Sequence, residues 1–225
     1  MSEFEHGQQT PWGYIIDAET LPNFITEAEY DSFTASKYHG DVRVAATIPS
    51  ASETIRNYCG WHISPSLDCG MIYRVQDIRD AFIGPDLLVQ LPATFISNVS
   101  KIVLDARWNA DEDDWDGEII TDPERFDFGT TDGLLRIYDV GPRDRRSKIF
   151  IRYTAGLSSG AIPLVKELTA NLTTHAIASP YGVSSEAAGG VSISYNATWA
   201  GKAGATALTN DTRELLNKYK AKGVF

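Results

Sequence analysis

Apolar residues recur at three- and four-residue steps in two long parts of the chain, which is the spacing that one face of an α-helix requires. The first part is Val42–Cys59 and the second is Ile162–Ser179, where Pro163 stands in the first turn, as is typical of a helix start. Pro49 conflicts with the first pattern, because proline removes a backbone donor and clashes with the preceding turn. We therefore expect a kink in that helix or a restart near Ser50.

Two shorter helices are predicted near the ends of the chain. In the segment Thr26–Ser36, Thr26 and Glu29 form a capping-box pattern at the start of a short helix. Asp211 caps a last helix, which carries the apolar residues Leu215, Leu216 and Tyr219.

Between the two long helical patterns, short β-rich runs alternate with clusters of Gly, Pro and Asp, which favours strands joined by turns. The expected strands are Met71–Val75, Leu87–Leu91, Val99–Leu104, Leu134–Tyr138 and Lys148–Tyr153. Another strand is expected at Val191–Tyr195, where apolar and polar residues alternate strictly, as in a half-buried strand or hairpin arm.

The order of these elements predicts an α+β fold, with a mainly α-helical body, a β-rich inserted subdomain and a C-terminal helix that follows a hairpin. We expect an N-terminal arm over residues 1–25, because aromatic residues are mixed there with Gly, Gln and Pro without any period. The helical domain would comprise residues 26–66 and 155–225, and the inserted subdomain residues 67–154.

Composition narrows the class of protein. The chain has 225 residues and a formal net charge of −10, which argues against a protein that grips the phosphate backbone of nucleic acid with clustered Lys and Arg. No apolar run approaches the length of a membrane span, and the N-terminus lacks the pattern of a signal peptide. The two cysteines, Cys59 and Cys69, are expected to be free thiols.

Two motifs suggest chemistry, and neither is complete. Gly156–Gly160 matches the GxSxG pattern of a hydrolase with Ser158 as the nucleophile, but the single downstream histidine, His175, lies within a predicted helix and cannot complete a triad. The acidic segment Asp111–Glu118 approximates a calcium-binding loop, but Pro123 stands where the closing Glu is needed. We expect no enzyme activity and no catalytic, cofactor-binding or metal-binding residue.

The acidic segment has a second interpretation. In a ring of subunits, Asp111–Glu118 could line a channel or face the basic residues Arg143, Arg145 and Arg146 of a neighbouring subunit.

Four stretches, in this order, resemble the connector or adaptor family of neck proteins in long-tailed bacteriophages. The likeness covers roughly residues 26–63 and 87–222. The family's early helix ends in a Tyr-Cys-Gly-Trp segment, and later segments show Leu-Pro before strands, Tyr-Thr-Ala-Gly before a proline, and Ser-Glu before Ser-x-Ser-Tyr. The matching stretches here are Ala51–Ile63, Leu91–Ala93 with Val99–Leu104, Ile151–Leu157 with Ile162-Pro163, and Gly182–Glu186 with Ser192–Tyr195.

The resemblance implies a homo-oligomeric ring, typically a dodecamer, in the neck of the virion. The ring would lie between the portal protein and a stopper or tail completion protein, and genomic DNA would pass through its lumen without specific binding. Such a protein is made in the cytoplasm of the host bacterium and has no membrane partner. The helices around Ile55 and Leu168 would form the subunit body.

The same resemblance indicates interface residues. In this family the C-terminal helix engages the portal, which here implies contacts by Leu208, Leu215, Leu216 and Tyr219. Contacts between subunits are expected of the hairpin residues Val191, Ile193 and Tyr195, whose apolar face needs a partner surface.

The alternative function is a tail-associated carbohydrate-binding or adhesion module. It is motivated by the β-rich middle of the chain and by tryptophans that could form a sugar platform, namely Trp61, Trp108, Trp115 and Trp199.

Overall fold

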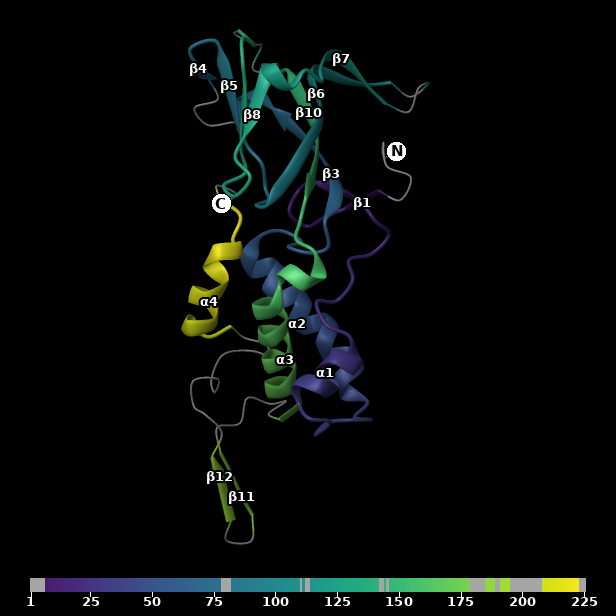
Figure 1. Cartoon of the computed structure of the whole chain (residues 1–225), viewed down its shortest axis with the longest axis vertical. Helices are drawn as coiled ribbons and strands as arrows, with labels where there is room; N and C mark the ends of the chain where they lie inside the picture. Colours follow the sequence, from purple (N-terminus) through teal and green to yellow (C-terminus); the bar gives the residue numbers. More distant parts are fainter. Residues whose placement is uncertain are drawn as a thin grey trace. The chain divides into compact units, whose positions relative to one another are not determined.

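The computed structural model describes residues 7–77, 82–109, 111, 114–141, 144, 146–178, 185–188, 191–194 and 208–222. The chain divides into two compact units. The first, here called the sheet unit, comprises residues 1–21, 60–158 and 220–225; the second, the helical unit, comprises residues 22–59 and 159–219. Figure 1 shows the elements of both units.

A six-stranded antiparallel sheet forms the larger part of the sheet unit, in the order β1-β2-β3-β10-β6-β7. Its strands are β1 (Gly7–Gln9), β2 (Ile15–Asp17), β3 (Leu67–Arg74), β6 (Ile96–Asn109), β7 (Asp114–Ile120) and β10 (Lys148–Ala155). The central strand β10 carries three successive buried residues, Ile149, Phe150 and Ile151. Successive side chains point to opposite faces, so β10 is covered on both.

A four-stranded antiparallel sheet completes this unit, in the order β4-β5-β9-β8. Its strands are β4 (Phe82–Ile83), β5 (Asp86–Gln90), β8 (Phe126–Phe128) and β9 (Leu134–Ile137), and one-turn 3-10 helices lie at Val75–Asp77 and Pro123–Arg125. The nearly buried carboxylate of Asp86 accepts two hydrogen bonds from Arg136, at 2.9 and 2.6 Å, and one from the backbone N–H of Asp139 at 3.2 Å. The Arg136 hydrogen bonds, followed by that of Asp139, lower the pKa of Asp86, so the pair stays ionised and ties β5 to β9.

The helical unit contains α1 (Glu27–Phe33), α2 (Arg43–Cys59), α3 (Pro163–Ala178) and α4 (Asn210–Leu216), with 3-10 turns at Ser159–Ala161 and Asn217–Tyr219. Helices α1, α2 and α3 lie side by side around a small apolar core (Figure 1), which is formed by Ile25, Tyr30, Val44, Ile48, Ala170 and Ile177. The strands β11 (Ser185–Ala188) and β12 (Val191–Ser194) form an antiparallel hairpin.

The capping box at the start of α1 also fastens this helix to α3. Thr26 Oγ1 accepts from the backbone N–H of Glu29 at 3.2 Å, and Glu29 Oε2 accepts from the backbone N–H of Thr26 at 2.8 Å. The other carboxylate oxygen of Glu29 accepts from Lys166 Nζ at 2.6 Å. The Lys166 hydrogen bond, then that of Thr26, lowers the pKa of Glu29 below its ordinary 4.5.

Replacing Glu29 by glutamine should therefore destabilise the helical unit in a pH-dependent way. Because the pKa of Glu29 is lower in the folded chain, its contribution is complete above about pH 4.5 and is lost as the pH falls through the lowered value. At neutral pH we expect a loss of about 0.5–1 kcal/mol, since the pair is partly exposed. Chemical unfolding followed by far-UV circular dichroism would measure it, and an equal loss at pH 3 and pH 7 would contradict the ion-pair explanation.

The prediction of a mainly α-helical body is wrong. Among the described residues, the two main sheets contain ten strands, whereas the four helices are short. The predicted strands and helices themselves are confirmed near their predicted positions, so the error lies in the segments interpreted as loops. The acidic segment continues into β7, and the N-terminal segment interpreted as an arm contains β1 and β2. Pairing with neighbouring strands formed sheet where local propensity did not indicate it.

Two local expectations also differ from the structure. Tyr14 and Ile16, in the supposed arm, are fully buried in the sheet unit. Helix α2 continues without interruption through Pro49. Pro49 has no backbone N–H to donate to the carbonyl oxygen of Ala45. Both residues are exposed, so water can donate to that carbonyl oxygen instead.

Candidate functional site

The C-terminal helix α4 is held against α2 by polar contacts at its last turn. Tyr58 Oη donates to the side-chain oxygen of Asn217 at 2.8 Å and also lies 3.2 Å from the carbonyl oxygen of Arg213. The Arg213 guanidinium lies 5.9 Å from the centre of the Tyr58 ring. Thr209 caps the helix by accepting from the backbone N–H of Thr212. These contacts fix which side of α4 faces the helical unit.

That orientation separates the four residues predicted to contact a portal protein. Leu216 is fully buried and Tyr219 is 5% exposed, so both contribute to the core of this chain. Leu208 is half-buried, and Leu215 is 48% exposed. In this conformation Leu215 is the member of the set that a partner could reach most readily.

Two of the three hairpin residues predicted to join subunits lie at known positions in the strand register. Val191 pairs with Ala188 and Ile193 pairs with Glu186, so these four positions share one face of the hairpin. Tyr195 lies outside the described residues. In the ranges that the structure describes, β11 and β12 pair only with each other.

The GxSxG segment has a structural explanation. Ser158 is exposed in the sheet unit, whereas His175 belongs to α3 of the helical unit. Gly156 has φ +121°, and a Cβ atom there would lie 2.2 Å from the carbonyl oxygen of Pro65. The glycine that begins the motif is therefore required by close backbone packing.

The acidic segment forms part of the β6–β7 hairpin. Asp114 is bound by Lys101 Nζ at 2.6 and 2.7 Å, and Glu118 lies 3.5 Å from Arg125. Asp111 is exposed. Within the described parts of the chain no three His, Cys, Asp or Glu side chains gather closely enough to hold a metal ion.

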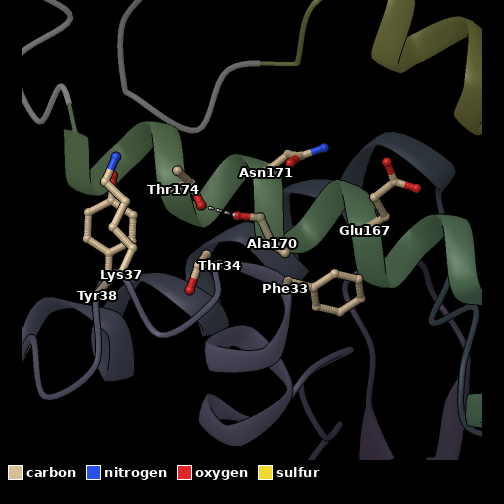
Figure 2. Close-up of a pocket in the computed structure, with 8 residues that line it drawn as sticks. All are labelled: Phe33, Thr34, Lys37, Tyr38, Glu167, Ala170, Asn171 and Thr174. Carbon is tan, nitrogen blue, oxygen red and sulfur yellow. Dashed lines mark hydrogen bonds between the residues drawn. The ribbon is translucent and has the colours of Figure 1, made fainter.

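Among the described residues, each unit has a hollow on its surface. The hollow of the helical unit has a volume of about 410 Å³ and lies between the end of α1 with its following turn and the middle of α3. Figure 2 shows Lys37, Tyr38 and Phe33 on one side and α3 on the other. Thr174 Oγ1 donates a hydrogen bond to the carbonyl oxygen of Ala170 at 2.9 Å, and Phe33 is half exposed.

The hollow of the sheet unit has a volume of about 600 Å³ and is lined by charged groups. Here it is called the basic hollow; its lining residues are Asp105, Ala106, Arg107, Trp108, Asp144, Arg146, Ser147 and Lys148. Of these residues, the sequence patterns indicated Arg146 and Trp108 alone as candidates for binding. The other residues could not be grouped with them, because β6 and the segment before β10 are far apart in the chain.

Both cysteines are free and buried, Cys59 in the helical unit and Cys69 in the sheet unit. Burial raises the pKa of the Cys69 thiol, so it remains protonated and unreactive. Among the helices of the described residues, none has the length and apolar character needed to cross a membrane.

Comparison with known proteins assigns no family. No protein-family model matches the sequence, and no curated protein matches it.

Proposed function

We propose that this chain is a structural subunit of the neck of a long-tailed bacteriophage, which forms a ring between the portal protein and the stopper or tail. The ordered set of sequence stretches from Ala51 to Tyr195 motivates this assignment. The β-rich subunit described above is compatible with it, since the proposal concerns assembly surfaces and needs no catalytic centre.

The structural observation that carries the proposal is the hairpin β11–β12. A two-stranded hairpin is at best marginally stable alone in water, and this one pairs with no other described strand. Val191 and Ile193 occupy the same face of the hairpin by register. A neighbouring subunit would supply the surface that stabilises such a hairpin.

The net charge of −10 suits the same role. A ring that lets DNA pass must avoid tight contacts with phosphate groups, and like-charge repulsion opposes them.

The test is the mass and particle shape of the purified full chain, with and without its cognate portal protein, by light scattering and negative-stain imaging. A ring, alone or on the portal, is expected. A compact monomer that ignores the portal would contradict the proposal and favour a carbohydrate-binding module, which a glycan-binding assay of the same sample would then test.

Leu215 provides a sharper test of portal binding. Its side chain is 48% exposed on α4, and replacement by lysine should weaken binding to the portal at least about tenfold, because a charged group would enter an apolar contact. The matched control is Val42→Lys, at an apolar residue of the helical unit that is 87% exposed and outside the proposed interface. Equal portal affinities of the two variants would remove α4 from the interface.

A further inference from the structure

The basic hollow is a local exception on a chain with a net charge of −10. Its lining includes three cationic residues, Arg107, Arg146 and Lys148, against two acidic ones, Asp105 and Asp144. The Asp144 carboxylate accepts a hydrogen bond from the backbone N–H of Arg146 at 2.9 Å, so it is partly engaged within the chain. All three cationic residues are exposed, and a ligand in the hollow can reach them.

Elsewhere in the sheet unit, cationic side chains are held in ion pairs. These pairs are Lys101 with Asp114, Arg125 with Glu118, Arg136 with Asp86, and Arg152 with Asp68. By contrast, the side chains of Arg107, Arg146 and Lys148 form no ion pair with any described residue. Arg107 lies opposite Asp116 in the strand register, but the Asp116 carboxylate accepts from Asn109 Nδ2 at 3.1 Å. A chain with an excess of carboxylates thus leaves three cations unpaired at one place.

Arg74 adds a fourth cation beside the hollow. The register of β3 and β10 places Arg74 directly opposite Lys148, so the two side chains lie on the same face of the sheet. Like charges in directly opposite positions destabilise a strand pair. Arg74 is exposed and likewise forms no ion pair within the described part of the chain. The fold therefore keeps two cations together against their repulsion, which an anion bound between them would relieve.

The walls of the hollow are fixed by the fold. The register of β6 shifts just before Arg107, and Asp105 has φ +55°, which marks a bulge that redirects the side chains beyond it. On the other side, the backbone N–H of Ser147 donates to the carbonyl oxygen of Asp144 at 2.9 Å, and the carbonyl oxygen of Ser147 accepts from Val75 at 3.0 Å. Because ordered backbone presents the cations, an anion can bind with little loss of conformational freedom.

The chemistry of the hollow selects phosphate groups. The planar guanidinium groups of Arg107 and Arg146 can each donate two parallel hydrogen bonds to phosphate oxygens, and the Lys148 ammonium adds a point charge. Several cations together call for an anion of several charges. The volume of about 600 Å³ lies in the range of small-molecule sites and exceeds what a single phosphate group fills. A short chain of linked phosphate groups meets both conditions.

The surroundings of the hollow disfavour an extended nucleic acid. Asp105 and Asp144 belong to its lining, and Asp116 lies opposite Arg107 on β7. A duplex would bring further phosphate groups over these carboxylates, and like-charge repulsion opposes that. A compact anion can contact the cations alone.

We propose that the basic hollow binds a small polyphosphate anion through Arg107, Arg146 and Lys148, with Arg74 at its rim. The anion is either inorganic polyphosphate or the phosphate chain of a nucleotide, which share this chemistry. The site goes beyond the proposed function, and neither depends on the other.

Calorimetric titration of the full chain with inorganic tripolyphosphate, at about 50 mM salt, tests the site. Saturable binding is expected, and Arg146→Gln with Lys148→Gln should weaken it at least about tenfold. No saturation by about 1 mM tripolyphosphate overturns the inference. Adenosine triphosphate is titrated in parallel: tighter binding than that of tripolyphosphate identifies a nucleotide as the source of the phosphate chain, and weaker binding identifies inorganic polyphosphate.

The control removes the same charge outside the hollow. Lys37→Gln with Lys222→Gln neutralises two exposed cations that do not belong to its lining, and should bind tripolyphosphate as the wild-type chain does. Equal weakening in this control means that the net charge of the chain governs binding, and overturns the inference. So does a wild-type chain that binds duplex DNA through Arg146 and Lys148 but binds no tripolyphosphate.

Unfolding in urea separates a binding role from a structural one. Without ligand, the variant Arg146→Gln with Lys148→Gln should be as stable as the wild-type chain or more stable, because the repulsion between Arg74 and Lys148 is removed. Saturating tripolyphosphate should stabilise the wild-type chain and leave the variant unchanged. Lower stability of the ligand-free variant would mean that these cations serve the fold, and the inference would fail.

Discussion

Replacing Gly156 by alanine is expected to lower the free energy of unfolding of the sheet unit by about 2–5 kcal/mol. The residue has φ +121°, a conformation that residues with a Cβ atom rarely adopt. A Cβ atom would also lie 2.2 Å from the carbonyl oxygen of Pro65 and 2.8 Å from the Cα atom of Ser66, and backbone atoms cannot rotate away. Gly156 further donates its N–H to the carbonyl oxygen of Phe95 at 3.3 Å, so a shift would disturb a second loop.

Gly84→Ala in the same unit is the matched control. Gly84 has φ +65°, and no atom of the described parts of the chain lies within 4 Å of a Cβ position there, so alanine introduces backbone strain without a clash. We expect it to cost about 1–2 kcal/mol. Chemical unfolding followed by tryptophan fluorescence reports on this unit, because four of the five tryptophans belong to it: Trp12, Trp61, Trp108 and Trp115. If Gly156→Ala costs no more than Gly84→Ala, the packing against Pro65 is unimportant.

The elements with strong periodicity could be predicted from the sequence. The apolar spacing of Val44, Ile48 and Ile55 indicated α2, and all three residues are buried. The alternation at Val191–Tyr195 likewise indicated β12. In α2 this single local pattern fixes which side of the helix faces the core.

Elements defined by their neighbours could not be predicted in this way. Strand β7 contains Asp114, Asp116 and Glu118, whose type disfavours strands, and it forms because β6 offers a long paired edge. Strand β2 is only three residues long, yet it pairs with β3 and buries Ile16 completely. The balance between sheet and helix in the fold depended on these segments.

The candidate sites, too, could be predicted from the sequence only where a local pattern indicates them. A C-terminal amphipathic helix could be predicted, but not that Leu216 faces the core and Leu215 faces outward, because the two are adjacent in sequence. The basic hollow combines Arg107 of β6 with Lys148 of β10, forty-one residues later, and no local spacing indicates that pair.

A buried hydrogen-bonded group in the sheet unit connects Tyr14, His62 and Ala155. Tyr14 Oη accepts from the backbone N–H of His62 at 3.0 Å and lies 2.8 Å from His62 Nδ1, while His62 Nε2 lies 3.0 Å from the carbonyl oxygen of Ala155. Because a carbonyl oxygen can only accept, Nε2 carries the proton and Nδ1 accepts from the tyrosine hydroxyl. Both side chains are fully buried, so this arrangement joins the segment before β2, the segment after α2 and the end of β10.

Tyr14→Phe should therefore destabilise the sheet unit by about 2–4 kcal/mol, since it removes the hydroxyl from two buried groups of His62 at once. Tyr153→Phe is the matched comparison: Tyr153 is also fully buried, but its hydroxyl has no hydrogen-bond partner among the described residues. Its removal should therefore change stability by less than about 0.5 kcal/mol or raise it. Tryptophan-monitored urea unfolding of the two variants measures the difference. Since both changes delete one oxygen atom from a buried ring of the same unit, lost packing cannot distinguish them; equal losses would mean that the bonds to His62 contribute nothing to stability, and a large gap would measure their contribution directly.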